Sequence, residues 1–136
     1  MLLSLSSSSP GNQPIISQIT GSVDADWVNL KDITATGGAT FKATNSIDFG
    51  NNTGWNIISP PSEKFYWVRH GGNWSDFFTY WYSTSGGSLD KPRMHNILDS
   101  VYFDANSFSS VGQTVTLDVE ANMANMDWRG VTNEPT

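Results

Sequence analysis

The chain has 136 residues, a net charge of −6 and no cysteine. The lack of cysteine excludes disulfides and thiolate metal sites, and the seven Lys and Arg residues are too scattered to form the basic patch that nucleic-acid binding needs. This length fits one domain, or two short pieces of a larger repetitive protein.

Short strands separated by turns are expected along the first part of the chain, because Ser, Thr, Asn and Gly are abundant and charged residues make up only 15%. After a polar segment, we predict strands at 15–20, 23–33, 39–44 and 55–58. Within 23–33, Val28 and Leu30 share one face, while Trp27, Asn29 and Lys31 share the other. Pro60 and Pro61 end this series and predict a boundary between residues 1–59 and 60–136.

The second part of the chain also predicts strands. The expected segments are 64–69, 77–82 (a strand or a short helix), 100–103, 113–120 and 123–128. The segment 113–120 alternates most cleanly, with Val115, Leu117 and Val119 on one face. A loop is predicted at 83–92. With about seven to nine short strands and no long amphipathic helix, the fold class is predicted to be all-β.

Aromatic residues are concentrated between Phe65 and Tyr82, a block that holds more than half of the chain's Phe, Trp and Tyr residues but only two charged ones, Arg69 and Asp76. Such a block fills a core or offers rings for stacking on a sugar. The hypothesis of an aromatic core is the stronger one. On the alternative, the ligand-binding rings are Trp74, Tyr80 and Tyr82.

Catalytic and metal-binding patterns are weak in this sequence. The two histidines, His70 and His95, lie in different segments, and no Gly-x-Ser-x-Gly motif accompanies Gly71 and Gly72. The turn that contains Asp104 and Asn106 is a weak candidate for Ca²⁺, although such turns more often bond to their own backbone. We therefore predict no enzymatic activity, no catalytic residues and no cofactor other than this candidate Ca²⁺.

Membrane insertion is not predicted, because no segment approaches the roughly 18 apolar residues of a membrane span. The start of the chain, from Met1 to Leu5, has neither the basic residues nor the length of apolar run that a signal peptide requires. If the protein is exported, we expect the export signal to lie outside this chain.

Two stretches of the chain resemble a known kind of repeat. Residues 21–57 contain Asp32, the run Ala35-Thr36-Gly37-Gly38-Ala39-Thr40, and Gly50-Asn51-Asn52-Thr53-Gly54-Trp55. Residues 66–135 contain Tyr66-Trp67-Val68, Gly72-Asn73-Trp74-Ser75-Asp76, Phe103-Asp104-Ala105-Asn106-Ser107-Phe108 and Asn125-Met126-Asp127-Trp128. These resemble, respectively, the closing segment of one repeat and the opening segment of the next in large β-rich surface proteins of bacteria or phages, of the adhesin or fibre type.

The resemblance implies a right-handed parallel β-helix, in which residues 1–59 close one repeat and residues 60–136 open the next. A β-sandwich is the alternative, because a single coil cannot bury its own faces without stacked neighbours. The implied function is a structural or adhesive module at a cell or virion surface, with a carbohydrate-binding module as the alternative. The partners expected are surface glycans or neighbouring repeats, with self-association as a further alternative.

Overall fold

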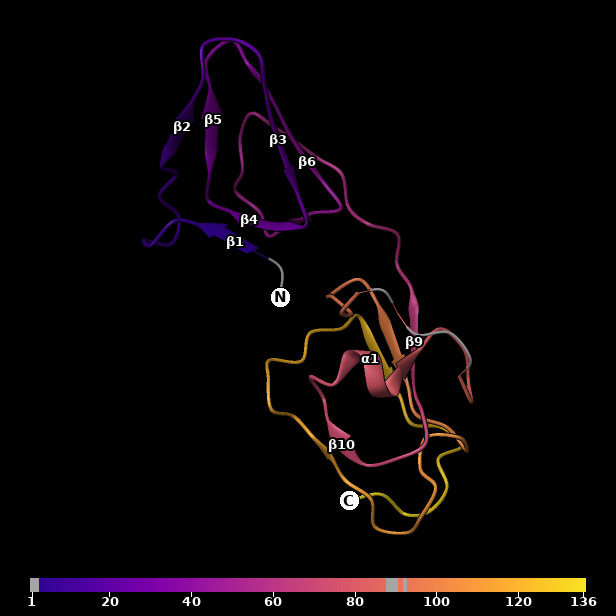
Figure 1. Cartoon of the computed structure of the whole chain (residues 1–136). Helices are drawn as coiled ribbons and strands as arrows, with labels where there is room; N and C mark the ends of the chain where they lie inside the picture. Colours follow the sequence, from indigo (N-terminus) through magenta and orange to yellow (C-terminus); the bar gives the residue numbers. More distant parts are fainter. Residues whose placement is uncertain (1–2, 88–90, 92) are drawn as a thin grey trace. The chain divides into compact units, whose positions relative to one another are not determined.

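The computed structural model describes residues 3–87, 91 and 93–136, so the part of the predicted loop at 88–90 and 92 lies outside the described residues. The chain divides into two compact units, Met1–Pro61 and Ser62–Thr136, here called the N-terminal unit and the C-terminal unit. The division falls at the Pro60–Pro61 pair. Figure 1 shows the first unit in indigo to magenta and the second in pink to yellow.

The N-terminal unit consists of short strands that pair in parallel. They are β1 (Leu3–Ser6), β2 (Ile15–Ser17), β3 (Ser22–Asp26), β4 (Val28–Lys31), β5 (Thr34–Thr36), β6 (Thr40–Thr44), β7 (Ile47–Asp48) and β8 (Trp55–Ile57). Three small sheets result, with strand orders β1-β4-β7, β2-β5 and β3-β6-β8. Figure 1 shows β1 with β4, β2 with β5, and β3 with β6 along three sides of one winding path.

The register of these sheets brings the chain back to the same side of the unit after each pass along the three sheets. We call one such pass a circuit. Ile15 pairs with Thr34 in β2 and β5, and Thr34 forms a further parallel bridge to Thr53. Likewise, Val23 pairs with Phe41, and Phe41 with Trp55. We call such a set of register partners on successive strands a column.

Burial along the columns of the N-terminal unit is greatest in the middle circuit. Leu30 and Ala43 are fully buried, whereas their register partners Leu5, Ala25 and Ile57 are only partly buried. The apolar core of this unit therefore lies on the middle strands, with the first and last strands covering it from either side.

Residues with a left-handed backbone make the corners between the strands. Gly11, Asp32 and Asn51 all have positive φ, between 55° and 83°. The side chain of Asp32 links them, since its carboxylate accepts hydrogen bonds from the Gly11 amide and from Nδ2 of Asn51, at 3.2 and 2.6 Å. Gly, Asp and Asn tolerate this conformation best, which explains these residue types at the corners.

The C-terminal unit contains a longer sheet and a shorter one. Its elements are β9 (Lys64–Trp67), β10 (Gly72–Asn73), α1 (Phe77–Tyr80), β11 (Trp81–Tyr82), β12 (Ser100–Tyr102), β13 (Val115–Thr116) and β14 (Asn125–Asp127). The sheets have the orders β11-β9-β12-β14 and β10-β13. All pairings in this unit are parallel except that of β11 with β9.

Aromatic and apolar side chains form columns inside this unit as well. Phe65 pairs with Val101, and Val101 with Met126. Just past the paired residues of β12 and β14, the rings of Phe103 and Trp128 follow that of Trp67, with centroids 6.1 and 3.9 Å apart, and we count this line of rings as a further column. Phe65, Trp67, Val101 and Phe103 are buried, so these columns are the core of the unit.

The all-β prediction is confirmed, since short strands predominate and α1 is a single helical turn. The sheets are small, and none closes on itself among the described residues. Several predicted boundaries are wrong. The segment 23–33 is interrupted at Trp27, which has φ 56°, and only Val115 and Thr116 of the segment 113–120 are paired. The segment 77–82 is a helical turn followed by a two-residue strand.

Candidate functional site

Trp74, one of the three predicted ligand-binding residues, is buried with 1% of its surface exposed. Its ring packs edge-to-face against Trp81, with centroids 4.8 Å apart, and against His95, at 5.0 Å. Its backbone carbonyl accepts a hydrogen bond from Nε1 of Trp81. In this structure the Trp74 ring therefore has no face available to a sugar.

Tyr80 and Tyr82, the other two predicted rings, are partly buried and held by contacts within the unit. Tyr80 stacks on Trp67, with centroids 4.8 Å apart, and its ring lies directly over Gly72, where a Cβ atom would stand 2.3 Å from it. Tyr82 lies against Gly87 in the same way, and its hydroxyl donates to the carbonyl of Thr79. The structure does not bring these three rings together as one exposed platform.

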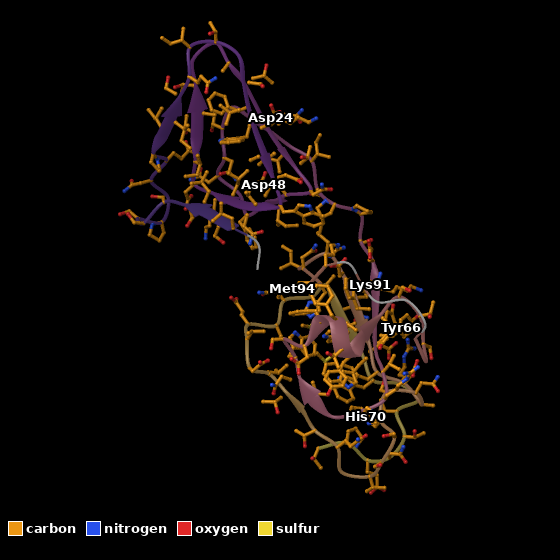
Figure 2. All side chains as sticks on the ribbon, in the orientation of Figure 1. Asp24, Asp48, Tyr66, His70, Lys91 and Met94 are labelled. Carbon is orange, nitrogen blue, oxygen red and sulfur yellow. The ribbon has the colours of Figure 1, made fainter. Side chains whose placement is uncertain are left out.

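Two other tyrosines lie side by side on the opposite side of the same sheet from the core. Tyr66 pairs in register with both Tyr82 and Tyr102, and the rings of Tyr66 and Tyr102 stack at 5.0 Å. Figure 2 labels Tyr66. Nζ of Lys64 lies 5.7 Å from the Tyr102 ring. Because these ring faces contact each other, the row mainly presents ring edges and hydroxyls.

His95 is buried inside a cage of aromatic rings. The rings of Phe65, Trp74, Phe77 and Trp81 surround it, all in edge-to-face contact with centroid distances of 5.0 to 5.8 Å. Nδ1 of His95 lies 3.0 Å from the carbonyl oxygen of Asn122, which only accepts, so Nδ1 carries the proton. Burial lowers the pKa of His95 below 6.5, despite the opposing effects of the Asn122 carbonyl and Asp99.

A cluster of ion pairs fixes the segment that carries His95. Asp99 is fully buried, and its carboxylate accepts two hydrogen bonds from the guanidinium of Arg93, at 2.6 and 2.9 Å. It also accepts the backbone amides of Glu63 and Asn96. Lys91, labelled in Figure 2, pairs with Glu63 and lies over the Phe65 ring. These contacts connect the residues just before β9 to those just before β12.

The candidate Ca²⁺ residues form a self-contained turn. Oδ1 of Asp104 accepts the amide of Asn106 at 2.8 Å, and Nδ2 of Asn106 donates to Oγ of Ser85 at 2.9 Å. Among the described residues, no group of three or more His, Cys, Asp and Glu side chains could hold a metal ion. The contacts of Asp104 and Asn106 are those of a side-chain-to-backbone turn.

The second histidine lies on an exposed surface next to a serine. Oγ of Ser109 is 3.0 Å from Nδ1 of His70, and Nε2 of Gln113 is 3.5 Å from the same nitrogen. A serine nucleophile requires a base that is oriented by a third group. No carboxylate is hydrogen-bonded to this imidazole among the described contacts. The pair therefore has a serine and a base but, in the part of the chain that is described, no group that orients the base.

The outer edge of β14 exposes apolar side chains of the C-terminal unit. A shallow depression is lined by Asn125–Arg129, and we call this segment the trailing edge. Met126 is 39% exposed and Trp128 43%, although each continues a column whose other members are buried. The trailing edge therefore presents core-type side chains to the surface.

Charges at the trailing edge neutralise each other. The guanidinium of Arg129 donates to the carboxylate of Asp127 at 2.6 to 3.1 Å. This hydrogen bonding lowers the pKa of Asp127 to about 2, so the pair remains ionised across the neutral range. Sequence reasoning predicted a strand at 123–128 but missed the exposed edge. The alternation of Met126 and Trp128 was the available signal.

Comparison with known proteins gives no match to a family model, a curated protein or a solved structure. No helix within the described part of the chain is long and apolar enough to cross a membrane.

Proposed function

We propose that this chain is a non-enzymatic structural or adhesive module whose two units are short stacks of parallel β coils, as in a right-handed β-helix. The observation that carries the proposal is the in-register column, in which one residue from each circuit of the chain contributes to the same line of core side chains. Phe65, Val101 and Met126 form such a column, as do Val23, Phe41 and Trp55.

Parallel pairing between successive circuits supports stacked coils over a β-sandwich. Sandwiches are built from antiparallel sheets packed face to face, whereas every pairing in the N-terminal unit is parallel among the described strands. Left-handed residues at equivalent corners, Gly11, Asp32 and Asn51, also fit a winding that repeats. Parallel crossovers are right-handed in nearly all proteins, which is the basis for the proposed hand.

The aromatic block supports a structural role for the C-terminal unit. Its largest rings fill the core, with Trp67, Trp74 and Trp81 all buried. Two of these indoles donate hydrogen bonds to backbone carbonyls, Trp67 to His70 and Trp81 to Trp74. Rings packed in this way stabilise a fold through their large buried area and leave little surface for a substrate.

The first strand of the C-terminal unit is covered on its outer side. β11 pairs antiparallel with β9 and ends the sheet there, after the helical turn α1. Edge strands that are covered or short resist unwanted pairing. The proposed stack thus has a capped end at β9 and an open end at the trailing edge.

Incubation of the purified chain with a panel of polysaccharides tests the proposed function. The structural or adhesive account predicts no release of reducing ends, with or without binding of the chain to the insoluble polymer. Release of reducing ends at a rate that scales with protein concentration, and that persists in protein purified by an independent route, would overturn it.

Carbohydrate binding is the second candidate, and the exposed Trp128 favours it. One face of this indole stacks on Phe103 at 3.9 Å, while Asn125, Asp127 and Arg129 supply polar groups around it. An aromatic ring beside a few polar groups is a common arrangement for sugar recognition. If this candidate is right, Trp128→Ala abolishes glycan binding, while Phe78→Ala, at a more exposed ring on α1, retains it.

The proposed location is extracellular, at a cell or virion surface, and the proposed partners are glycans or neighbouring repeats. The resemblance of the residue patterns to surface-protein repeats is what supports this location. The coil stack supports neighbouring repeats as partners, because stacked units bury their open faces against one another.

A further inference from the structure

Two columns of the core end at the trailing edge, and the last residue of each column is left exposed there. In the first column Phe65 and Val101 are fully buried, and in the second Trp67 and Phe103 are almost so. Met126 and Trp128, which follow them, are the exposed members. β14 is also the last strand of its sheet, so its outer backbone groups have no strand partner among the described residues. Such an edge is a template for a further strand.

The N-terminal unit also has an exposed edge, formed by its first strands, whereas the trailing edge is formed by the last strand of the C-terminal unit. β1, β2 and β3 are each the end strand of their sheets, and we call these three strands the leading edge. Leu3 is 70% exposed, although its register partner Val28 is buried. Ile16 and Val23 are partly exposed, although their partners Ala35 and Phe41 are buried. The first circuit can therefore pair with a further circuit on its open side.

The leading edge lacks the protection that edge strands usually have. Natural edges are blocked by charged side chains, especially lysine. Residues 3–23, which contain β1 and β2, include no Asp, Glu, Lys, Arg or His, and the first charged residue in β3 is Asp24. At the trailing edge, Asp127 and Arg129 cancel each other's charge. The carboxylates of the leading edge are thus confined to the end of β3, at Asp24 and Asp26, while β1 and β2 offer uncharged strands to a neutral trailing edge.

We propose that the trailing edge of one chain binds the leading edge of a second copy, by parallel strand pairing that continues the core columns. The inference rests on the proposed coil stack. Trailing and leading edges fit each other as successive circuits do inside each unit, with Met126 and Trp128 covered by the first circuit of the next copy. Because the trailing and leading edges are different surfaces of the same chain, the contact is head-to-tail and extends into chains.

Two lysine substitutions, one on each edge, test whether the edges bind each other. Leu3→Lys blocks the leading edge and Met126→Lys the trailing edge. In sedimentation velocity across a concentration series, we expect the unmodified protein to shift to masses of two and more protomers, and each variant alone to stay at 14.9 kDa. An equimolar mixture of the two variants retains one intact pair of edges, so it forms a dimer and nothing larger.

Phe78→Lys is the matched control, because Phe78 is 71% exposed on α1, an element that belongs to neither edge. This variant is expected to associate like the unmodified protein. Leu3 is so exposed that Leu3→Lys keeps the fold, and this arm decides the question if Met126→Lys does not fold.

Three results would overturn the inference. One is an unmodified protein that stays monomeric over the whole concentration series. Another is a Leu3→Lys variant that still dimerises alone, which would show that association does not need an intact leading edge. The third is a protein that binds glycan through its trailing edge and remains monomeric. Disulfide cross-links between register partners inside each unit separate failure of this inference from failure of the coil stack: cross-links that form while the chain stays monomeric contradict only this inference.

Discussion

Single buried polar residues decide how well the C-terminal unit holds its aromatic core. His95 and Asp99 lie on the same segment, one inside the ring cage and the other in the ion-pair cluster. Neither residue type belongs in an apolar interior without a partner. Each is therefore a position where a small chemical change has a large effect.

Protonation of His95 is expected to destabilise the folded protein. Burial lowers the pKa of His95 in the folded state, with Asp99 and the Asn122 carbonyl opposing this shift and Arg93 reinforcing it. Because the folded pKa lies below the unfolded value of about 6.5, the stability is complete above pH 6.5 and decreases as the pH falls toward the folded pKa. We predict that urea unfolding between pH 8 and pH 5 shows this decrease.

His95→Gln should remove this pH dependence, while His70→Gln, at the exposed histidine, should leave it in place. Equal slopes of unfolding free energy against pH for both variants would contradict the assignment to His95.

Removing the Asp99 carboxylate should be far more damaging than removing the one on Asp127. Asp99 is fully buried and holds Arg93 together with two backbone amides, so Asp99→Ala leaves a buried charge and two donors unsatisfied. The expected loss is about 3–5 kcal/mol of unfolding free energy. Asp127→Ala breaks a pair whose arginine is 90% exposed, and chemical denaturation should detect little change. A loss for Asp99→Ala no greater than that for Asp127→Ala would refute this ranking.

At the scale of elements, the columns make stability depend on which circuit a residue occupies. Leu30 and Leu5 belong to the same column, with Leu30 fully buried in β4 and Leu5 partly buried in β1. The chemistry of the two side chains is identical, and only the number of covering strands differs.

Leu30→Ala is predicted to cost about 2–5 kcal/mol, as is usual for a buried leucine, and Leu5→Ala clearly less. Thermal and urea unfolding of the two variants provide the comparison. Similar losses at both positions would mean that Leu5 is packed as completely as Leu30. That result is inconsistent with an open leading edge.

Local patterns predicted some of these elements and missed others for physical reasons. The alternation of Val28 and Leu30 correctly identified their buried face, because β4 is covered by strands on both sides. Leu117 and Val119 alternate just as cleanly, yet both are exposed, because pairing with β10 stops at Thr116. β7 and β10 are two residues long and include Asp, Gly and Asn, so their pairing depends on neighbouring circuits that local propensity does not describe.

The candidate site was harder to predict than the fold. Concentration of aromatic residues pointed to Trp74, Tyr80 and Tyr82, but a ring's exposure depends on its place in a column and not on composition. Trp128 was not predicted as a binding ring, because it lies outside the aromatic block, and its stack on Phe103 connects residues from different circuits. The alternation within 123–128 indicated a strand but not that the strand would be the last in its sheet.

At the scale of the whole molecule, the proposed function depends on open strand edges and on the register of successive circuits. The N-terminal unit begins with open strands, and the C-terminal unit begins with a covered strand and ends with an open one. If the chain is a structural module, its function is to continue a stack, and the catalytic machinery of an enzyme is not needed for that. The register of successive circuits is therefore the central claim.

Engineered disulfides test this register most directly, since the chain has no cysteine of its own. The account predicts that cysteines at the register partners Asp24 and Lys42, and at Lys64 and Ser100, form disulfides within the monomer under mild oxidation. Cysteines two positions out of register, at Asp24 with Thr40 and at Lys64 with Tyr102, should remain free in peptide mass spectrometry. Equal cross-linking of in-register and out-of-register pairs, or none in either, would contradict the stacked parallel coils.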